Sequence, residues 1–233
     1  LVANSHTTLL LFSSKGKAYW LKTYEIPEAS RAARGRPLVN LLPLDSDEYI
    51  TTMLPVEEYT EGHFIFMATA KGTVKKTPLE SFSRQRSVGL IALELDEGDV
   101  LISAAITDGE REVMLFSDGG KVTRFKEADV RAMGRTARGV RGMRLPEGQK
   151  LISMLIPEEG SQILTASERG YGKRTAISEF PEYKRGGQGV IAMVSNDRNG
   201  RLVGAVQVLD GEEIMLISDQ GTLVRTRVAE VSS

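Results

Sequence analysis

The stretch IFMATAKG at residues 65–72 decides the fold, because its pattern occurs five times in the 233-residue chain. The other copies are LLLFSSKG at 9–16, VMLFSDGG at 113–120, ILTASERG at 163–170 and IMLISDQG at 214–221. Each copy is an apolar run that leads through a hydroxyl residue and a polar turn to a glycine. An apolar strand, a short turn and a second strand are typical of a β-hairpin. The glycine supplies a positive φ, and the hydroxyl can bond to the turn backbone.

The five glycines are separated by 56, 48, 50 and 51 residues. After each hairpin we expect a looser arm, an apolar strand, an acidic turn and a last strand. The apolar strands are predicted at 38–42, 90–93, 143–145 and 190–193, and the last strands at 50–54, 101–106, 151–156 and 202–206. Each unit thus has about four short strands, close to the ~40–50-residue period of propeller blades. Single helical turns are expected at 78–82 and 126–130.

This pattern predicts an all-β, propeller-like fold in one domain over residues 1–233. Repeats are expected at about 8–56, 63–107, 112–157 and 162–208, with a partial last blade at 213–233. Residues 1–4 are expected to form the end of a first blade. Because blades need neighbours to bury their faces, we expect six units in a disc or shallow spiral.

The composition excludes several classes of protein. The chain has no cysteine and only two histidines, which argues against disulfide scaffolds, thiolate zinc sites and Cys nucleophiles. No apolar run approaches the roughly 18 residues of a membrane span, and no signal peptide is recognised. We therefore expect a cytoplasmic protein without a membrane partner. The 30 basic and 31 acidic residues leave a net charge of −1.

Charge follows the repeat, although the total is near zero. The windows 15–36, 71–89, 121–144, 169–189 and 221–227 contain 26 of the 30 basic residues and only 7 acids. Their net charge is +19, and the rest of the chain carries −20. Residues at equivalent positions of successive repeats in a radial fold lie at the same height and at the same distance from the central axis. We therefore expect the positive windows to form a ring, with the acidic turns elsewhere. Arginine forks onto phosphate oxygens, and neighbouring glycines allow a close approach of the backbone.

These cations are the candidate phosphate-binding residues, and no catalytic or metal-binding residue is assigned. The candidates are Lys15, Lys17, Arg31, Arg34, Arg36, Lys71, Lys75, Lys76, Arg84, Arg86, Lys121, Arg124, Lys126, Arg131, Arg135, Arg138, Arg141, Arg169, Lys173, Arg174, Lys184, Arg185, Arg225 and Arg227.

Several alternatives are open at this point. The basic arms can be solvated loops without a ligand, or can meet an acidic protein partner on a propeller-like scaffold. An enzyme built on a propeller lacks any convergent acid–base or metal set. The acidic turn at 45–48 does not match a calcium-binding loop. Trp20 stands where other repeats place Lys or Arg, which favours packing or contact with an arm over base stacking.

Five strings closely resemble the C-terminal domain of bacterial DNA gyrase A. They are ATAKGTVKKT at 68–77, EVMLFS at 112–117, VRAMG at 130–134, GYGKRT at 170–175 and GTLVRTRV at 221–228. The resemblance covers essentially the whole chain, and it implies a six-bladed β-pinwheel whose blades exchange strands. The related topoisomerase IV domain shares that architecture and is the alternative. The family's Gln-Arg-Arg-Gly-Gly-Lys-Gly box is absent, with a partial echo at 184–189.

The resemblance also implies function. A domain of this family wraps duplex DNA around its perimeter without reading sequence, and serves ATP-dependent negative supercoiling by a type II topoisomerase. The implied partners are double-stranded DNA, the rest of DNA gyrase A and the DNA gyrase B protein, in a heterotetramer of the bacterial cytoplasm and nucleoid. ATP and Mg are used elsewhere in that holoenzyme, so the resemblance implies a domain without catalysis or a cofactor of its own.

Overall fold

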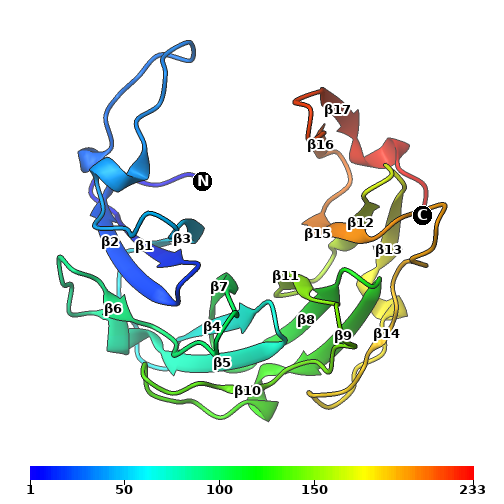
Figure 1. The fold of residues 1–233 in the computed structure, drawn as a ribbon, viewed down its shortest axis with the longest axis horizontal. Coiled ribbons are helices and arrows are strands. Elements are labelled where there is room, and N and C mark those ends of the chain that lie inside the picture. The colour runs from blue at the N-terminus through cyan, green and yellow to red at the C-terminus, as the bar shows by residue number, and fades with distance from the viewer. The chain divides into compact units, whose positions relative to one another are not determined.

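The computed structural model describes all residues 1–233, and it is all-β, with short 3-10 turns and no α-helix. The chain divides into two compact units, whose strands are labelled in Figure 1. The first comprises Leu1–Glu110 and Val130–Arg141, and the second comprises Arg111–Asp129 and Gly142–Ser233. The expectations of one domain and of six blades stay predictions.

The first unit contains two four-stranded antiparallel sheets. Their orders are β3-β1-β2-β6 and β10-β5-β4-β7. The strands are β1 (Thr8–Ser13), β2 (Lys17–Lys22), β3 (Ile50–Val56), β4 (Phe64–Thr69), β5 (Thr73–Pro78), β6 (Leu90–Ile91), β7 (Leu101–Thr107) and β10 (Val140–Arg141). Contacts between β3 and β7 join the two sheets along one edge, and the edge strands on the opposite side are β6 and β10.

The second unit contains sheets of four, three and two strands. Their orders are β11-β8-β9-β14, β13-β12-β15 and β16-β17. The strands are β8 (Glu112–Ser117), β9 (Lys121–Lys126), β11 (Leu151–Leu155), β12 (Gln162–Ser167), β13 (Gly172–Ala176), β14 (Val190–Ile191), β15 (Leu202–Val208), β16 (Glu213–Ile217) and β17 (Leu223–Arg227). All five predicted hairpins are therefore present.

Strand exchange between repeats is confirmed in three sheets. The short strand that ends each arm pairs with the second hairpin strand of the preceding repeat, as β6 on β2, β10 on β5 and β14 on β9. We call the segments that follow the hairpins the arms; they are residues 26–37, 83–91, 130–141 and 181–191. Each of the last three arms begins in its own repeat and ends on the sheet of the preceding repeat. This exchange links successive blades through backbone hydrogen bonds.

The exchanged strands are shorter than predicted, because their continuation turns onto a glycine. The amides of Ala92 and Leu93 both donate to the carbonyl oxygen of Gly16, at 2.8 and 3.1 Å. Ala192 and Met193 repeat this arrangement on Gly120. Two donors that converge on one acceptor break the alternating bonds of a β ladder. Pairing therefore stops after two residues.

Three other predicted strands are wrong in position or type. Residues 143–145 form no strand; the exchanged strand of that arm is β10, and the amide of Arg144 donates to the carbonyl of Gly187 at 2.9 Å. Residues 38–42 contain the 3-10 turn η2 (Leu38–Asn40), closed by bonds back to the Leu38 carbonyl. Residues 1–4 lie outside any strand.

The helical turns predicted at 78–82 and 126–130 are confirmed as 3-10 turns. They are η3 (Leu79–Phe82) and η4 (Glu127–Asp129), and equivalent turns are η1 (Thr23–Glu25), η5 (Ile177–Glu179) and η6 (Val228–Glu230). Each follows the second hairpin strand directly. No helix is long and apolar enough to cross a membrane.

The first hairpin strands β1, β4, β8 and β12 are largely buried on both faces, which explains their continuous apolar runs, whereas β16 is mostly exposed. In β1 every residue from Thr8 to Ser13 is buried. Phe12 meets Phe82 edge-to-face at 5.8 Å between ring centroids, and Phe116 meets Phe180 in the same way at 6.4 Å. In each pair the second ring comes from the next repeat, so the core itself fixes where each arm starts.

Candidate nucleic-acid interface

The five hairpin turns share one geometry. The glycine that ends each turn has a φ between 76° and 92°, and its amide donates to the carbonyl of the hydroxyl residue three positions earlier. That hydroxyl oxygen accepts from the amide one residue after the glycine, as Ser13 does from Lys17 at 3.3 Å and Ser218 from Thr222 at 3.0 Å. The predicted roles of the glycine and of the hydroxyl are both confirmed. The turns hold the second hairpin strand, and hence its side chains, in the same register in every repeat.

The acidic turns lie against the hairpin turns, contrary to the expected separation of charge. The buried carboxylate of Glu48 accepts hydrogen bonds from the hydroxyls of Ser13 and Tyr19, at 2.5 and 3.0 Å. The carboxylate of Asp99 accepts from the amide of Lys71 at 2.9 Å. The physical reason is that these acids satisfy amides and hydroxyls of the turns, which their spacing in the sequence does not reveal.

Several candidate cations pair with these and other carboxylates. The Lys15 ammonium lies 2.7 Å from Asp47 and 3.0 Å from Asp45, and these hydrogen bonds raise its pKa above the ordinary value. Arg138 contacts Glu94 and Asp96. Further candidates with a carboxylate partner are Arg124, Lys126, Arg174, Lys184 and Arg225. The pairs in which both side chains are exposed, such as Lys15–Asp47, contribute little to stability and can exchange partners.

Lys75 is buried completely and cannot meet a phosphate at the surface. Its ammonium donates to three backbone carbonyls, those of Ala92 at 2.7 Å, Arg135 at 2.5 Å and Ala137 at 3.0 Å. The Ala92 carbonyl directly follows the arm 83–91, and the other two carbonyls lie within the arm 130–141, so Lys75 ties both arms to β5. Lys76 is also buried, with its ammonium 4.8 Å from the centroid of the Phe64 ring. Their predicted surface role is therefore replaced by a structural one.

Burial, and to a smaller extent the positive charge of Arg135, lower the pKa of Lys75 to about 8. The unfolded chain keeps the ordinary value near 10.5. Between these values the unfolded state binds more protons, so the free energy of unfolding is expected to rise with pH, by about 3 kcal/mol over the window. Urea unfolding of the wild type and of Lys75→Met at pH 7.5 and pH 10 checks this, because the variant lacks the increment. Equal pH dependence in both proteins would contradict the assignment.

In three of the five repeats, the fourth residue after the hairpin glycine contacts the end of the 3-10 turn in the following repeat. Trp20 donates its indole N–H to the carbonyl of Phe82 at 3.2 Å. Arg124 donates to the carbonyl of Phe180 at 2.8 Å, and Arg174 to that of Val231 at 2.7 Å. The acceptor is in each case ten residues after the glycine of the following repeat. The expected contact of Trp20 with an arm is confirmed at the residue from which that arm starts, and Arg124 and Arg174 make the equivalent hydrogen bonds in their repeats.

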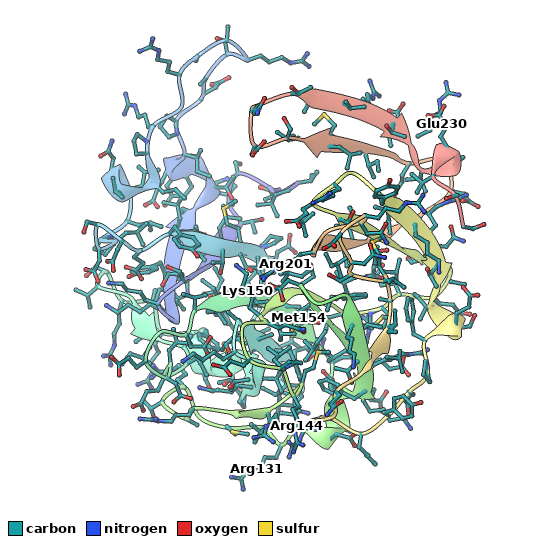
Figure 2. All side chains as sticks on the ribbon, turned by 45° about the vertical axis from the view of Figure 1, so that its right-hand side comes forward. Arg131, Arg144, Lys150, Met154, Arg201 and Glu230 are labelled. Atoms are coloured by element: carbon teal, nitrogen blue, oxygen red, sulfur yellow. The ribbon has the colours of Figure 1, made fainter.

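The remaining candidates divide by exposure. Exposed on the arms are Arg31, Arg34, Arg36, Arg84, Arg86, Arg131, Arg138, Arg141 and Lys184, while Arg135 and Arg185 are half-buried there. Exposed on or beside the hairpins are Lys15, Lys71, Lys126, Arg169, Lys173, Arg225 and Arg227, and half-buried are Lys17 and Lys121. The side chain of Arg131 extends away from the ribbon (Figure 2). The arms between 83 and 91 and between 130 and 141 contain no acid at all.

One pattern on the exchanged strands was missed by sequence reasoning. Ile91 faces Lys17 across the β6–β2 pair, and Ile191 faces Lys121 across the β14–β9 pair. In the third pair the charges change places, because Arg141 on β10 faces Thr73 on β5. Each exchanged edge therefore presents one cation at the same place, from one strand or the other. The signal is invisible until the register between repeats is known.

The arm glycines do not all serve the predicted approach of a phosphate. A Cβ on Gly139 would collide with the carbonyl of Val74, and one on Gly189 with that of Val122. Both residues have positive φ and let an arm cross a neighbouring strand closely. At Gly35 and Gly187 no atom lies within 4 Å of such a Cβ, so a phosphate can approach the backbone there.

Two surface hollows lie where arms meet a hairpin. One of about 310 Å³, in the first unit, is lined by Lys71, Thr73, Asp96, Arg138, Gly139 and Arg141. The other, of about 320 Å³ in the second unit, is lined by Lys126, Asp129, Glu182, Tyr183 and Lys184. No group of three or more His, Asp or Glu side chains is placed to hold a metal ion. The first hollow has three cationic side chains and one acid and can pair with an anion, whereas in the second the two lysines pair with Asp129 and Glu182.

Comparison with known proteins gives a consistent result. A family model described as "DNA gyrase C-terminal domain, beta-propeller" matches residues 7–57, 63–108, 111–158, 161–208 and 212–233. The DNA gyrase A protein of Pseudomonas aeruginosa is 64% identical, with 100% of this chain and 30% of that protein covered. The gyrase A protein of Escherichia coli K12 is 57% identical, over 100% of this chain and 26% of that protein. The chain thus spans less than a third of these relatives.

Solved structures agree with the sequence matches. A DNA gyrase A C-terminal domain is 31% identical with a TM-score of 0.84, over 99% of this chain and 75% of the other. A C-terminal domain of DNA topoisomerase IV is 29% identical with a TM-score of 0.88, over 98% of this chain and 72% of the other.

Proposed function

Since the chain belongs to the DNA gyrase C-terminal domain family, we propose that it binds duplex DNA along its basic arms and bends it. The observation that carries the proposal is the recurrence of exposed arginines on arms that are anchored in the same way on successive sheets. Phosphates recur along a duplex, so cations that recur along a protein fit them without reading bases.

Anchoring is what makes bending possible. Bending a duplex by 40–90° over 20–30 bp costs about 1–6 kcal/mol, which contacts on both sides of the bend must supply. The arm between 130 and 141 is held by the β10–β5 pair and by the hydrogen bonds from Lys75 to the carbonyls of Arg135 and Ala137. Arginines on a fixed backbone resist displacement by a stiff duplex better than arginines on a free loop.

We propose that the domain acts within DNA gyrase, by wrapping DNA for ATP-dependent negative supercoiling in the cytoplasm. Its partners there would be the rest of the gyrase A protein and the gyrase B protein. The identities of 57 to 64% to gyrase A proteins support gyrase over topoisomerase IV. The chain offers anion-binding side chains and no convergent acid–base set, which supports a non-catalytic role in which strand cleavage and ATP hydrolysis occur elsewhere in the enzyme.

Binding should be tolerant of sequence and steeply dependent on salt. The expected slope of log K against log salt concentration is about −0.9 for each phosphate neutralised. Fluorescence anisotropy with two labelled duplexes of equal length and unrelated sequence measures both properties. A flat salt dependence, or strong preference for one duplex, would count against the proposal and favour a scaffold that binds a protein partner.

A further inference from the structure

We propose that Glu94 and Asp96 are internal competitors of DNA for Arg138, so that this arm binds a phosphate only by exchanging ion partners. The inference rests on the proposed function and adds a restraint to the same site. Nη1 of Arg138 lies 2.9 Å from Oδ1 of Asp96, and Nη2 lies 3.2 Å from Oε1 of Glu94. The two ends of one guanidinium are thus occupied by two carboxylates.

The geometry makes this pairing exchangeable. The side chains of Arg138, Glu94 and Asp96 are 65%, 54% and 56% exposed, so water and salt reach all three. Ion pairs at such exposure are weak and impose little cost on an anion that replaces one partner. Arg138 also lines the 310 Å³ hollow with Lys71 and Arg141, where a phosphate would meet further positive charge.

The competing carboxylates do not belong to the arm that they restrain. Glu94 and Asp96 follow the exchanged strand β6, whereas Arg138 precedes the exchanged strand β10. The amide of Glu94 approaches the carbonyl of Ala137 at 3.5 Å, which keeps the two segments adjacent. The restraint therefore sits where one arm ends beside the next, along the path that DNA would follow.

The proposal predicts a shallower salt dependence than the number of cations suggests. When a DNA phosphate pairs with Arg138, the DNA releases a condensed cation, while Glu94 and Asp96 together bind a cation from solution. Uptake at the carboxylates offsets release from the DNA. Without the carboxylates the offset disappears, and the salt slope should become steeper by about 0.9, the amount for one phosphate.

The test uses the whole chain, a fluorescein-labelled duplex of mixed sequence and the double variant Glu94→Gln, Asp96→Asn. A matched control is Glu57→Gln, Glu58→Gln, because both glutamates are exposed in the same unit, bear the same charge and make no ion pair. We expect the first variant to bind about 3- to 10-fold more tightly than the control at low salt, the range that two exposed ion pairs allow.

The decisive comparison makes the same changes in a chain that also carries Arg138→Ala. If the carboxylates act through Arg138, their removal there should have no effect beyond that of the control. Two results would overturn the inference. One is equal affinity of the variant and the control when Arg138 is intact, and the other is tighter binding of the variant that persists with Arg138→Ala. Failure of the proposed function is distinct, because the wild type itself would then show no salt-dependent binding.

Discussion

Replacing Arg131, Arg138 and Arg141 by alanine is expected to weaken duplex binding by about 10- to 100-fold at low salt and to make the salt slope shallower by about 2. Arg131 extends into solvent, Arg138 lines the hollow of the first unit, and Arg141 supplies the cation of the β10 edge. Each would contact a phosphate. The lost contacts of Arg131 and Arg141 each remove one released counterion, whereas at Arg138 the release is offset by cation uptake at Glu94 and Asp96. Anisotropy over a series of salt concentrations measures affinity and slope together.

The matched control for this variant removes the same charge outside the arms. Lys150, Arg198 and Arg201 are exposed in the second unit, and Lys150 and Arg201 adjoin the hairpin-turn residue Asp118. The triple alanine variant at these positions should change the affinity only slightly and leave the slope nearly intact. Equal losses in both variants would mean that binding follows net charge alone, and the arms would have no special part in it.

Gly16→Ala is expected to destabilise the first unit by about 3–5 kcal/mol. The residue has a φ of 76°, and an added Cβ would lie 2.5 Å from the carbonyl oxygen of Leu93. The chain crosses there because Ala92 and Leu93 both donate to Gly16. The substitution therefore costs left-handed strain and also forces apart the crossing that ends the arm. Urea unfolding measures the loss.

Gly62→Ala separates these two costs. Gly62 has nearly the same φ, 79°, but nothing lies within 4 Å of its added Cβ. It lies in the same unit and should cost only about 1–2 kcal/mol, the strain of the left-handed backbone. If the two variants lose equal stability, the crossing at Gly16 contributes nothing and the account of strand exchange is wrong at this point.

The hairpins and their repeat could be predicted because every signal for them is local. A hydroxyl, a turn and a glycine lie within four residues, and the same bonds form in all five copies. The exchanged strands could not be placed as well. They are two residues long, and their ends depend on carbonyls such as that of Gly16, more than 70 residues away in the chain.

Candidate cations could be recognised by type but not by environment. Lys75 and Arg131 are equivalent in a count of charge, yet one is enclosed by three carbonyls and the other extends into solvent. The carbonyls that enclose Lys75 come from two arms, and only the fold brings them together. The acids were misplaced for the same reason, since Glu48 lies 35 residues from the Ser13 hydroxyl that it binds.

The central claim is that the arms hold duplex DNA on a bent path, and closing nicked plasmid in the presence of the chain tests it most directly. After ligation and removal of the protein, gel electrophoresis gives the linking number. The account predicts a shift of one sign that grows with protein concentration and is much reduced by the Arg131, Arg138 and Arg141 variant. An unchanged distribution at concentrations that saturate the plasmid would contradict it.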